Sequence, residues 1–137
     1  MPKFSQDSFT KLSTCHIDLQ HLFYEVVKTF DCTILQGYRT EDEQEKAYKA
    51  GATKLHYPDG KHNAKPSLAV DVAPFPIDWH DTKRFYYFGG YVMAVAQRLY
   101  DENKITHAIR WGGDWNRNSS FIDEKGLIDL VHFELIT

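Results

Sequence analysis

Hydrophobic positions in the chain follow two helical patterns of different length. Between residues 19 and 30 they recur at the spacing of a single helical face. The members of this face are Leu19, Leu22, Phe23, Val26, Val27 and Phe30. A longer amphipathic pattern runs from Asp81 to Glu102, and its pair Gly89–Gly90 marks a point where another element can pack closely. A capping box, Thr40-Glu41-Asp42-Glu43, predicts a third helix that ends at Gly51.

Short apolar segments predict the strands of a sheet. They span residues 32–36, 68–73, 109–111 and 129–135. Successive side chains of a strand point to opposite faces, so His132 and Glu134 share one face of the last segment. By the same rule Asp71 shares its face only with Ala69 and Ala73, and a buried carboxylate there needs a partner. Strands combined with about three helices predict an α+β domain.

Length and composition suit one globular domain over residues 1–137. The chain is 42% hydrophobic and 15% aromatic, which fits a dense core and a groove for an extended ligand equally well. Its formal net charge is -3 and it has no basic run, so nucleic acid is not an expected partner. Cys15 is placed in a helical segment and Cys32 beside an apolar run, and we expect both to be small buried residues.

Nothing in the sequence indicates a protein bound in a membrane. The longest apolar runs are far too short to span a bilayer. The first residues lack the charged start and the apolar stretch of a signal peptide. We therefore expect a protein made and kept in a cytoplasm, and a substrate outside the membrane would require separate delivery of the protein.

Ligating side chains interrupt two of the predicted buried strands. Asp71 lies in one, and His132 lies in the other with Asp129 shortly before it. Residues 52–66 show no periodicity and are typical of a long functional loop, from which His62 can fold back toward Asp71. A catalytic zinc site uses three protein ligands and leaves a fourth position for water. Spacing alone leaves the set open, because seven His make chance triples easy and His132 also suits a hydrogen-bonded core position.

Two segments carry a resemblance to a known family. They run from Lys61 to Pro74 (KHNAKPSLAVDVAP) and from Asp129 to Glu134 (DLVHFE). Together they resemble the split zinc signature of the D-alanyl-D-alanine carboxypeptidase superfamily, and within it the phage endolysins that are L-alanyl-D-glutamate peptidases. Further matches are Gln36 to Thr40, Ile77 to Trp79 and Trp111 to Asn116. The resemblance extends from about residue 30 to the C-terminus.

Carried over position by position, the resemblance implies a zinc peptidase. The fold would be that of the zinc D-Ala-D-Ala peptidases and hedgehog proteins, with an antiparallel sheet flanked by helices. His62, Asp71 and His132 would hold Zn²⁺, and Asp129 would be the catalytic carboxylate that takes a proton from the zinc-bound water. Arg39, the second catalytic candidate, would bind the substrate or polarise its carbonyl.

The sequence departs from the family pattern around the first histidine. Gly60 stands where the family usually has Ser, and Ser67 stands where a Gly is expected. The gap from His62 to Asp71 is also slightly longer than usual. His56, in the same loop, is the alternative ligand. We favour His62 because it matches the family's Lys-His element and because its short, stiff connection to the strand costs less entropy.

Aromatic turns provide further candidate contacts with the substrate. Asp78–Trp79 and Asp114–Trp115 are each typical of a structural turn, and the alternative is that they line the substrate groove. From the second turn we take Asp114 and Trp115 as substrate-binding residues. Glu134 is expected to accept a hydrogen bond from a metal-bound His132. The histidines expected to be ordinary surface or cap residues are His16, His21, His80 and His107.

The expected function is that of an endolysin, a zinc-dependent peptidoglycan hydrolase that cleaves the L-alanyl-D-glutamate bond of the stem peptide. It would be a monomer that lyses the host bacterium by attacking the cell wall after its release from the cytoplasm, and so would be antimicrobial. A D-alanyl-D-alanine carboxypeptidase or dipeptidase on the same fold is the alternative. A non-catalytic, zinc-bearing binding module is the third possibility, and the presence of both Asp129 and Arg39 argues against it.

Overall fold

One antiparallel sheet contains the predicted strands. The computed structural model describes residues 2–121 and 128–137, and within them the four strands of this sheet lie in the order β1-β2-β4-β3. Their bounds are β1 Cys32–Gln36, β2 Ala69–Pro74, β3 Ile109–Gly112 and β4 Asp129–Leu135. Neighbouring strands all run antiparallel. The two central strands, β2 and β4, are therefore hydrogen-bonded to each other although they lie far apart in the chain.

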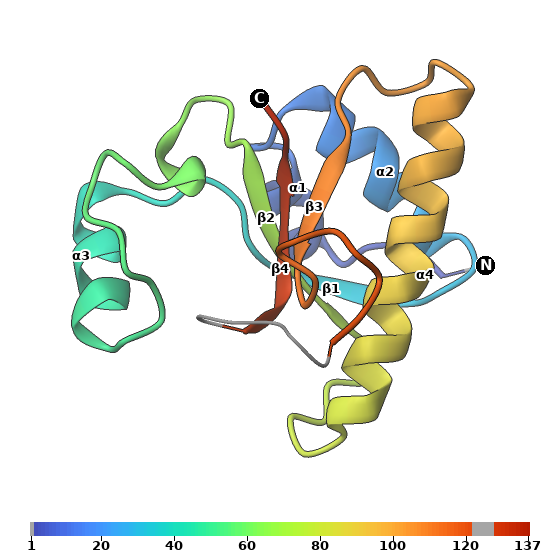
Figure 1. Ribbon diagram of the computed structural model, residues 1–137. Coiled ribbons are helices and arrows are strands. Elements are labelled where there is room, and N and C mark those ends of the chain that lie inside the picture. The colour runs from blue at the N-terminus through green and yellow to red at the C-terminus, as the bar shows by residue number, and fades with distance from the viewer. Residues whose placement is uncertain (1, 122–127) are drawn as a thin grey trace.

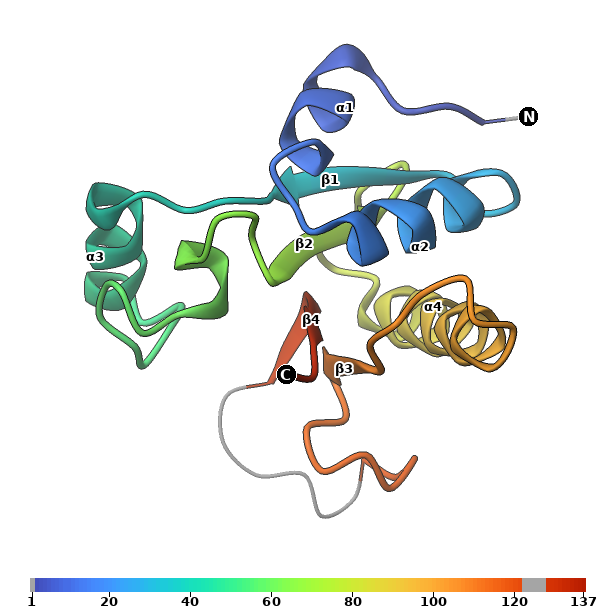
Figure 2. The same cartoon turned by 90° about the horizontal axis from the view of Figure 1, so that it is seen from above.

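Helices cover the two sides of the sheet unequally. On one side, α2 (Ile17–Val27) and α4 (Thr82–Asp101) pack against each other, and α4 also contacts β2, β3 and β4. On the opposite side, α3 (Glu41–Lys49) and the loop after it stand apart from that pair (Figure 1, Figure 2). The short helix α1 (Gln6–Leu12) packs against β1. An antiparallel sheet flanked by helices confirms the predicted α+β fold class.

Side chains that alternate along β2 and β4 give the sheet an apolar face and a polar face. Val70 lies opposite Phe133 across the two strands, and both are fully buried. The Phe133 ring packs edge to face against Phe23 of α2, with 5.4 Å between ring centroids. Burying one such side chain stabilises the fold by roughly 1.5–3 kcal/mol. The core thus uses one face of these strands and leaves the other face for polar side chains.

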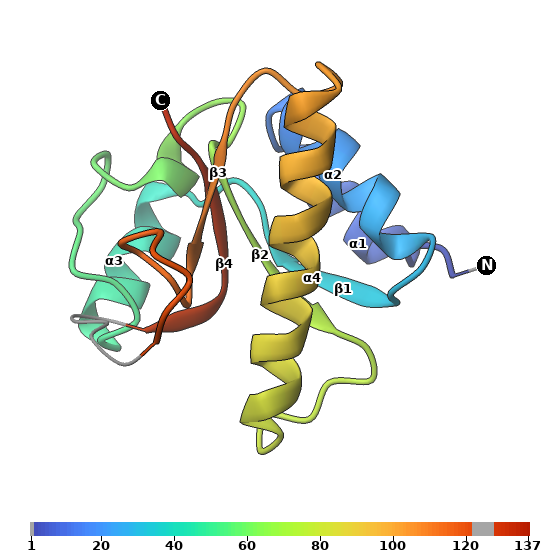
Figure 3. The ribbon, with the colours of Figure 1, turned by 45° about the vertical axis from the view of Figure 1, so that its right-hand side comes forward.

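The close approach expected at Gly89–Gly90 occurs at the first of the two glycines. A Cβ on Gly89 would lie 2.1 Å from Cζ2 of Trp111, so a side chain there would collide with the indole. Trp111 in turn donates its indole N–H to the Leu130 carbonyl at 2.9 Å. Glycine therefore lets α4 pack directly against β3, and Figure 3 shows α4 running beside the sheet. The hydrogen bond of the same tryptophan holds the first part of β4.

Some features differ from the sequence expectations. The pattern does not predict α1, because Leu12 is its only buried apolar residue and one position gives no periodicity. Cys15 lies between α1 and α2, in an isolated bridge to Ser67, and not in a helix. Both Cys15 and Cys32 are buried free thiols, as expected. The long loop contains one short 3-10 turn, η1 (Lys61–Asn63). No helix in residues 2–121 or 128–137 is both long and apolar enough to cross a bilayer.

Candidate functional site

Asp71 and His132 are partners across the centre of the sheet. The antiparallel pairing of β2 with β4 places them directly opposite each other, so both side chains leave the sheet on its polar face. The distance from His132 Nδ1 to Asp71 Oδ1 is 3.3 Å. Strand pairing thus brings together two ligating residues that are 61 positions apart in the chain.

His62 reaches the same carboxylate oxygen from η1. Its Nε2 lies 3.2 Å from Asp71 Oδ1, and its Nδ1 lies 2.8 Å from the Gly37 carbonyl oxygen. The His62 backbone carbonyl accepts a hydrogen bond from Arg39 N at 2.8 Å, and the residue is buried. The ligating atoms of His62, Asp71 and His132 all lie within 4.8 Å of one another. The structure therefore brings together the three residues expected to hold the metal.

Each imidazole forms a hydrogen bond on the side away from Asp71, and this bond determines which ring nitrogen carries the proton. A carbonyl oxygen only accepts, so His62 donates from Nδ1 to Gly37. His132 likewise donates from Nε2 to the Glu134 carboxylate at 2.8 Å. In neutral rings, His62 Nε2 and His132 Nδ1 then direct lone pairs toward Asp71 Oδ1. Three lone-pair-bearing atoms that face one another fit a cation, and two imidazoles with one carboxylate suit zinc.

Without a metal, electrostatic attraction holds the side chains of His62, Asp71 and His132 together. Burial by itself raises the pKa of Asp71, but hydrogen bonds from His132 and His62 outweigh it and hold that pKa well below its usual range. Burial lowers the pKa of His132, but its contacts with Asp71 and Glu134 outweigh burial and raise the pKa to about 9. A proton on His132 and a metal ion would therefore compete for the same position.

Glu134 holds His132 from the side away from Asp71, and is itself paired. Its Oε1 accepts from His132 Nε2, and its Oε2 lies 3.2 Å from Lys61 Nζ. Lys61 Nζ also donates to the Leu135 carbonyl. Since Lys61 precedes His62 in the chain, this contact joins the loop to β4 next to the ligand group. The contact expected between Glu134 and His132 is present.

Asp129, the candidate general base, is the first residue of β4. It lies opposite Gly112, where the register of β3 and β4 shifts. It lines the same cavity as His62 and His132. Burial raises the pKa of Asp129, and the charge of Asp71 raises it further, against a smaller lowering by the two histidines. A carboxylate with a raised pKa binds a proton more readily than an exposed aspartate, which suits a group that accepts and returns a proton.

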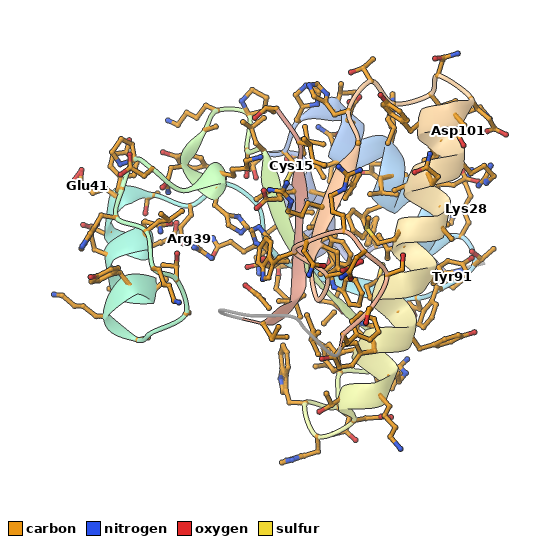
Figure 4. The ribbon with its side chains drawn as sticks, in the orientation of Figure 1. Cys15, Lys28, Arg39, Glu41, Tyr91 and Asp101 are labelled. Atoms are coloured by element: carbon orange, nitrogen blue, oxygen red, sulfur yellow. The ribbon has the colours of Figure 1, made fainter. Side chains whose placement is uncertain are left out.

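Arg39 lies in the segment between β1 and α3, on the side of the sheet where α3 stands (Figure 4). The next residue, Thr40, begins the expected capping box, in which its side chain accepts from Glu43 N and the Glu43 carboxylate accepts from Thr40 N. Arg39 Nη2 lies 3.5 Å from Asp71 Oδ2. The guanidinium therefore contacts one candidate metal ligand directly, and its role toward the substrate stays a prediction.

Gln44 and Asn63 hold this region in place, although no sequence pattern points to their role. Gln44 Oε1 accepts from Arg39 Nη1 at 3.1 Å and from Asn63 Nδ2 at 3.3 Å. Its Nε2 donates to the Leu55 carbonyl at 2.7 Å. Asn63 Oδ1 accepts from Gly60 N, and a Cβ on Gly60 would lie 2.9 Å from that oxygen. The Asn63 carboxamide thus fills the space that a serine at position 60 would need.

An open cavity of about 430 Å³ lies beside the ligand group. Its walls include Arg39, His62, Trp115, Asp129 and His132. The Trp115 ring lies 5.4 Å from the His132 ring, in the groove position expected for it. Asp114 is not among the described residues that line this cavity. Its carboxylate accepts from the backbone N–H groups of Asn118 and Ser119, so Asp114 lies in a turn, and its contact with substrate stays a prediction.

His56, the alternative ligand, lies apart from the group. Its Nδ1 is 2.8 Å from Glu45 Oε2, and its ring packs on Tyr48 with 3.8 Å between centroids. The His56 side chain is 55% exposed. Geometry therefore favours His62 as the loop ligand.

A second group, formed by His16, Asp18 and His107, also has ligating atoms within 4.8 Å of one another. Several of its ligating atoms already form hydrogen bonds within the protein. Asp18 Oδ2 accepts from His107 Nδ1 at 2.7 Å and from Thr106 N at 2.9 Å. His16 Nδ1 accepts from Asp18 N at 3.0 Å and caps α2. These bonds join α2 to residues 106–107, which agrees with the cap role expected for such histidines.

Fold and site together define a class of protein: a small α+β domain with a group of potential metal ligands on the polar face of a sheet, beside an open cavity. The chain belongs to the phage L-alanyl-D-glutamate peptidase family, whose sequence profile matches residues 1–136. It is thus a peptidase that acts on peptidoglycan.

A solved structure supports the same fold. The crystal structure of the Serratia marcescens L-Ala D-Glu endopeptidase ChiX superposes with a TM-score of 0.72. The alignment covers 98% of this chain and 91% of that chain at 20% sequence identity. A search of curated protein sequences found no match.

Proposed function

We propose that His62, Asp71 and His132 hold a catalytic zinc ion with which the chain cleaves the L-alanyl-D-glutamate bond of the stem peptide. The observation that carries this proposal is the convergence of two imidazole nitrogens on Asp71 Oδ1 beside an open cavity. When bound, zinc supplies a Lewis acid that lowers the pKa of a coordinated water to about 7. Family membership supports the choice of bond, as does the L-Ala D-Glu endopeptidase activity of the structural neighbour.

Asp129 acts in this proposal as the proton acceptor. Its carboxylate lines the cavity together with the two histidine ligands but is not one of the three converging residues. It takes a proton from the attacking water and passes it to the amine of D-glutamate as the peptide bond breaks. The raised pKa of Asp129 favours the first step, because its carboxylate binds a proton more readily than that of an exposed aspartate.

Arg39 has two tasks in this scheme. Its Nη2 faces Asp71 Oδ2 and so orients the carboxylate whose other oxygen faces the histidines. Its guanidinium also lines the cavity, where a fixed cation stabilises negative charge that develops on the peptide carbonyl oxygen. Gln44 limits the motion of the side chain by accepting from Nη1.

The metal is tested by elemental analysis and by chelation. The purified protein should contain about one zinc per chain, as expected for one three-ligand catalytic site. Removal of zinc with a strong chelator should abolish digestion of purified peptidoglycan, and added zinc should restore it. Full activity of the metal-free protein would contradict the proposal.

The bond is tested by mass spectrometry of digested peptidoglycan. A new D-glutamate amino terminus is expected from wild-type protein and not from the Asp129→Asn variant, which differs little in shape. Release of D-alanine would instead show the D-alanyl-D-alanine carboxypeptidase activity of related enzymes. Products identical to those of an undigested sample, from zinc-loaded protein, would support a binding module without catalysis.

The remaining parts of the proposal concern assembly and place of action. All three candidate ligands and Asp129 come from one chain, so the site needs no second copy, and we expect a monomer by light scattering. The protein is expected to lyse the host when it reaches the wall from the cytoplasm. Lysis of cells by added protein only after their outer barrier is permeabilised would fit this order.

A further inference from the structure

The ring of Trp79 packs against a neighbouring ring and is otherwise exposed to solvent. It lies in the turn before α4, where His80 N donates to Asp78 Oδ1 at 3.0 Å and Asp81 N donates to the Asp78 carbonyl at 3.1 Å. Its ring stacks on Phe85 with 5.3 Å between centroids and 21° between planes. Even so, Trp79 is 61% exposed. The stacked ring thus presents a large aromatic surface to solvent, and such a surface can bind a ligand ring.

A small cavity adjoins this tryptophan and shares one lining residue with the cavity of the candidate active site. Trp79, Thr82 and Phe85 form one wall of the cavity, which measures about 160 Å³, and the first residues of β4 form the other. Asp129 lines both this cavity and the larger one that contains the histidines. The turn before α4 and the start of β4 lie at the same end of the molecule in Figure 1 and Figure 3. Asp129 therefore lies between the two cavities.

These two regions differ in charge. The larger cavity is lined by the charged residues Arg39, Lys54, Asp59, Lys61, Asp129 and Glu134. Among the described residues that line the smaller cavity, Asp129 is the only charged one. One side of Asp129 thus suits a charged ligand, and the other suits an uncharged ring with an apolar face.

The two sides of the scissile bond differ in the same way. On its carboxyl side, D-glutamate and the residues after it carry free carboxylates. On its amino side, a single L-alanine separates the bond from the lactyl group of N-acetylmuramic acid, an uncharged pyranose. One residue spans at most about 3.6 Å, so the sugar must lie next to the catalytic groups. A cavity of about 160 Å³ is smaller than the roughly 300–1,000 Å³ of pockets for whole ligands and suits one ring.

We propose that the Trp79 cavity binds the N-acetylmuramic acid residue that carries the scissile stem peptide. The sugar lies with its C–H face on the exposed face of the indole, opposite Phe85. The charged cavity then receives the D-glutamate side. This inference rests on the proposed function and adds to it the direction in which the substrate lies. It also predicts that the enzyme distinguishes a stem peptide attached to the sugar from a free one.

The test compares cleavage of N-acetylmuramyl-L-alanyl-γ-D-glutamyl-diaminopimelate with that of the same tripeptide lacking the sugar. Trp79→Ala should lower kcat/KM for the sugar-bearing substrate by roughly three- to tenfold, the effect of one aromatic stacking contact, mainly through KM. The value for the free tripeptide should change less than about twofold, because the contact with the sugar is then absent already. Trp79→Phe should retain most of the activity.

Tyr100→Ala is the matched control, because Tyr100 is also an exposed aromatic residue of the α4 region and lines neither cavity. It should behave as wild type with both substrates. Equal losses on both substrates for Trp79→Ala would overturn the proposal and make Trp79 a peptide or structural contact. Unchanged activity on both would overturn it as well.

A binding measurement separates this inference from the proposed function. N-acetylmuramyl-L-alanine should shift the indole N–H resonance of Trp79 in the NMR spectrum of ¹⁵N-labelled protein, whether or not the protein cleaves a peptide. L-alanine alone should not shift it. If the sugar leaves this resonance in place, the cavity does not bind it, even where the peptidase activity is confirmed.

Discussion

Replacing Glu134 tests whether the hydrogen bond behind His132 prepares the metal site. The Glu134 carboxylate accepts from His132 Nε2 at 2.8 Å, and the two side chains are only 11% and 13% exposed. When the ring is neutral, this bond keeps its proton on Nε2, so Nδ1 presents a lone pair toward Asp71. In Glu134→Ala the proton can move to Nδ1, where it occupies the position that a metal would take. We therefore expect weaker zinc binding in a folded protein.

The expected magnitude follows from the geometry. Loss of an outer partner of a ligating histidine typically weakens metal binding by about 10–100-fold, or roughly 1.4–2.7 kcal/mol. Glu134→Gln should lose less than Glu134→Ala, because its amide oxygen still accepts from Nε2 although it carries no charge. Lys61 also loses its partner, but its side chain is 30% exposed and water can replace the contact at little cost.

The assay is a zinc competition titration against a chromophoric chelator, with thermal unfolding as a check on the fold. Glu45→Ala is the matched control: it removes a Glu–His pair of the same 2.8 Å length, between Glu45 and His56, outside the ligand group. Its zinc affinity should equal that of wild type. Wild-type affinity in Glu134→Ala, or equal losses in both variants, would refute the reasoning.

The remaining predictions concern single residues. Asp129→Asn should keep its zinc and fold while turnover falls by about 10²-fold or more, the usual loss when a general base is removed; loss of zinc would make Asp129 a ligand. His62→Ala should lose most of its zinc and nearly all activity, whereas His56→Ala should keep both within a few fold, and bound zinc in the two purified variants decides between them. Burial raises the pKa of Asp18, but hydrogen bonds from His107 and Thr106 outweigh it and lower the pKa. The stability that Asp18 adds is therefore present at a pH above 3.8, its ordinary pKa, and is lost as the pH falls through the lower pKa of the folded protein. Thermal melts of wild type should therefore weaken below pH of about 4 more than melts of Asp18→Asn, and parallel curves would contradict this.

Most of what the sequence could predict about the site came from the alternation of side chains between the two faces of each strand. It placed His132 and Glu134 on one face of β4 and Asp71 on a face of small residues in β2, and the pairing of Asp71 with His132 follows once these strands are neighbours. Family resemblance supplied His62, since a loop residue has no periodic signal. The ligand roles stay predictions until zinc is measured.

Polar side chains within irregular segments could not be predicted in the same way. Gln44 is almost fully buried on a helix that is otherwise polar, and its neighbours in space come from the loop that follows. Asp114 precedes an aromatic residue that does reach the cavity, yet its own carboxylate turns to backbone N–H groups. Two residues of one motif can therefore differ in role, because the side chains of consecutive residues in a turn point in different directions.

The longer gap between His62 and Asp71 is accommodated without loosening the ligand. Leu68 N donates to the Lys61 carbonyl at 3.0 Å and closes the inserted residues into a turn, and Ser67 N donates to the Thr14 carbonyl at 2.9 Å. The segment is therefore held at both ends of the insertion. Lys61 is held a second time by Glu134, the residue that also orients His132. Extra length in a loop costs little entropy once its ends are held, so His62 can come from a long segment and still meet the strand ligands.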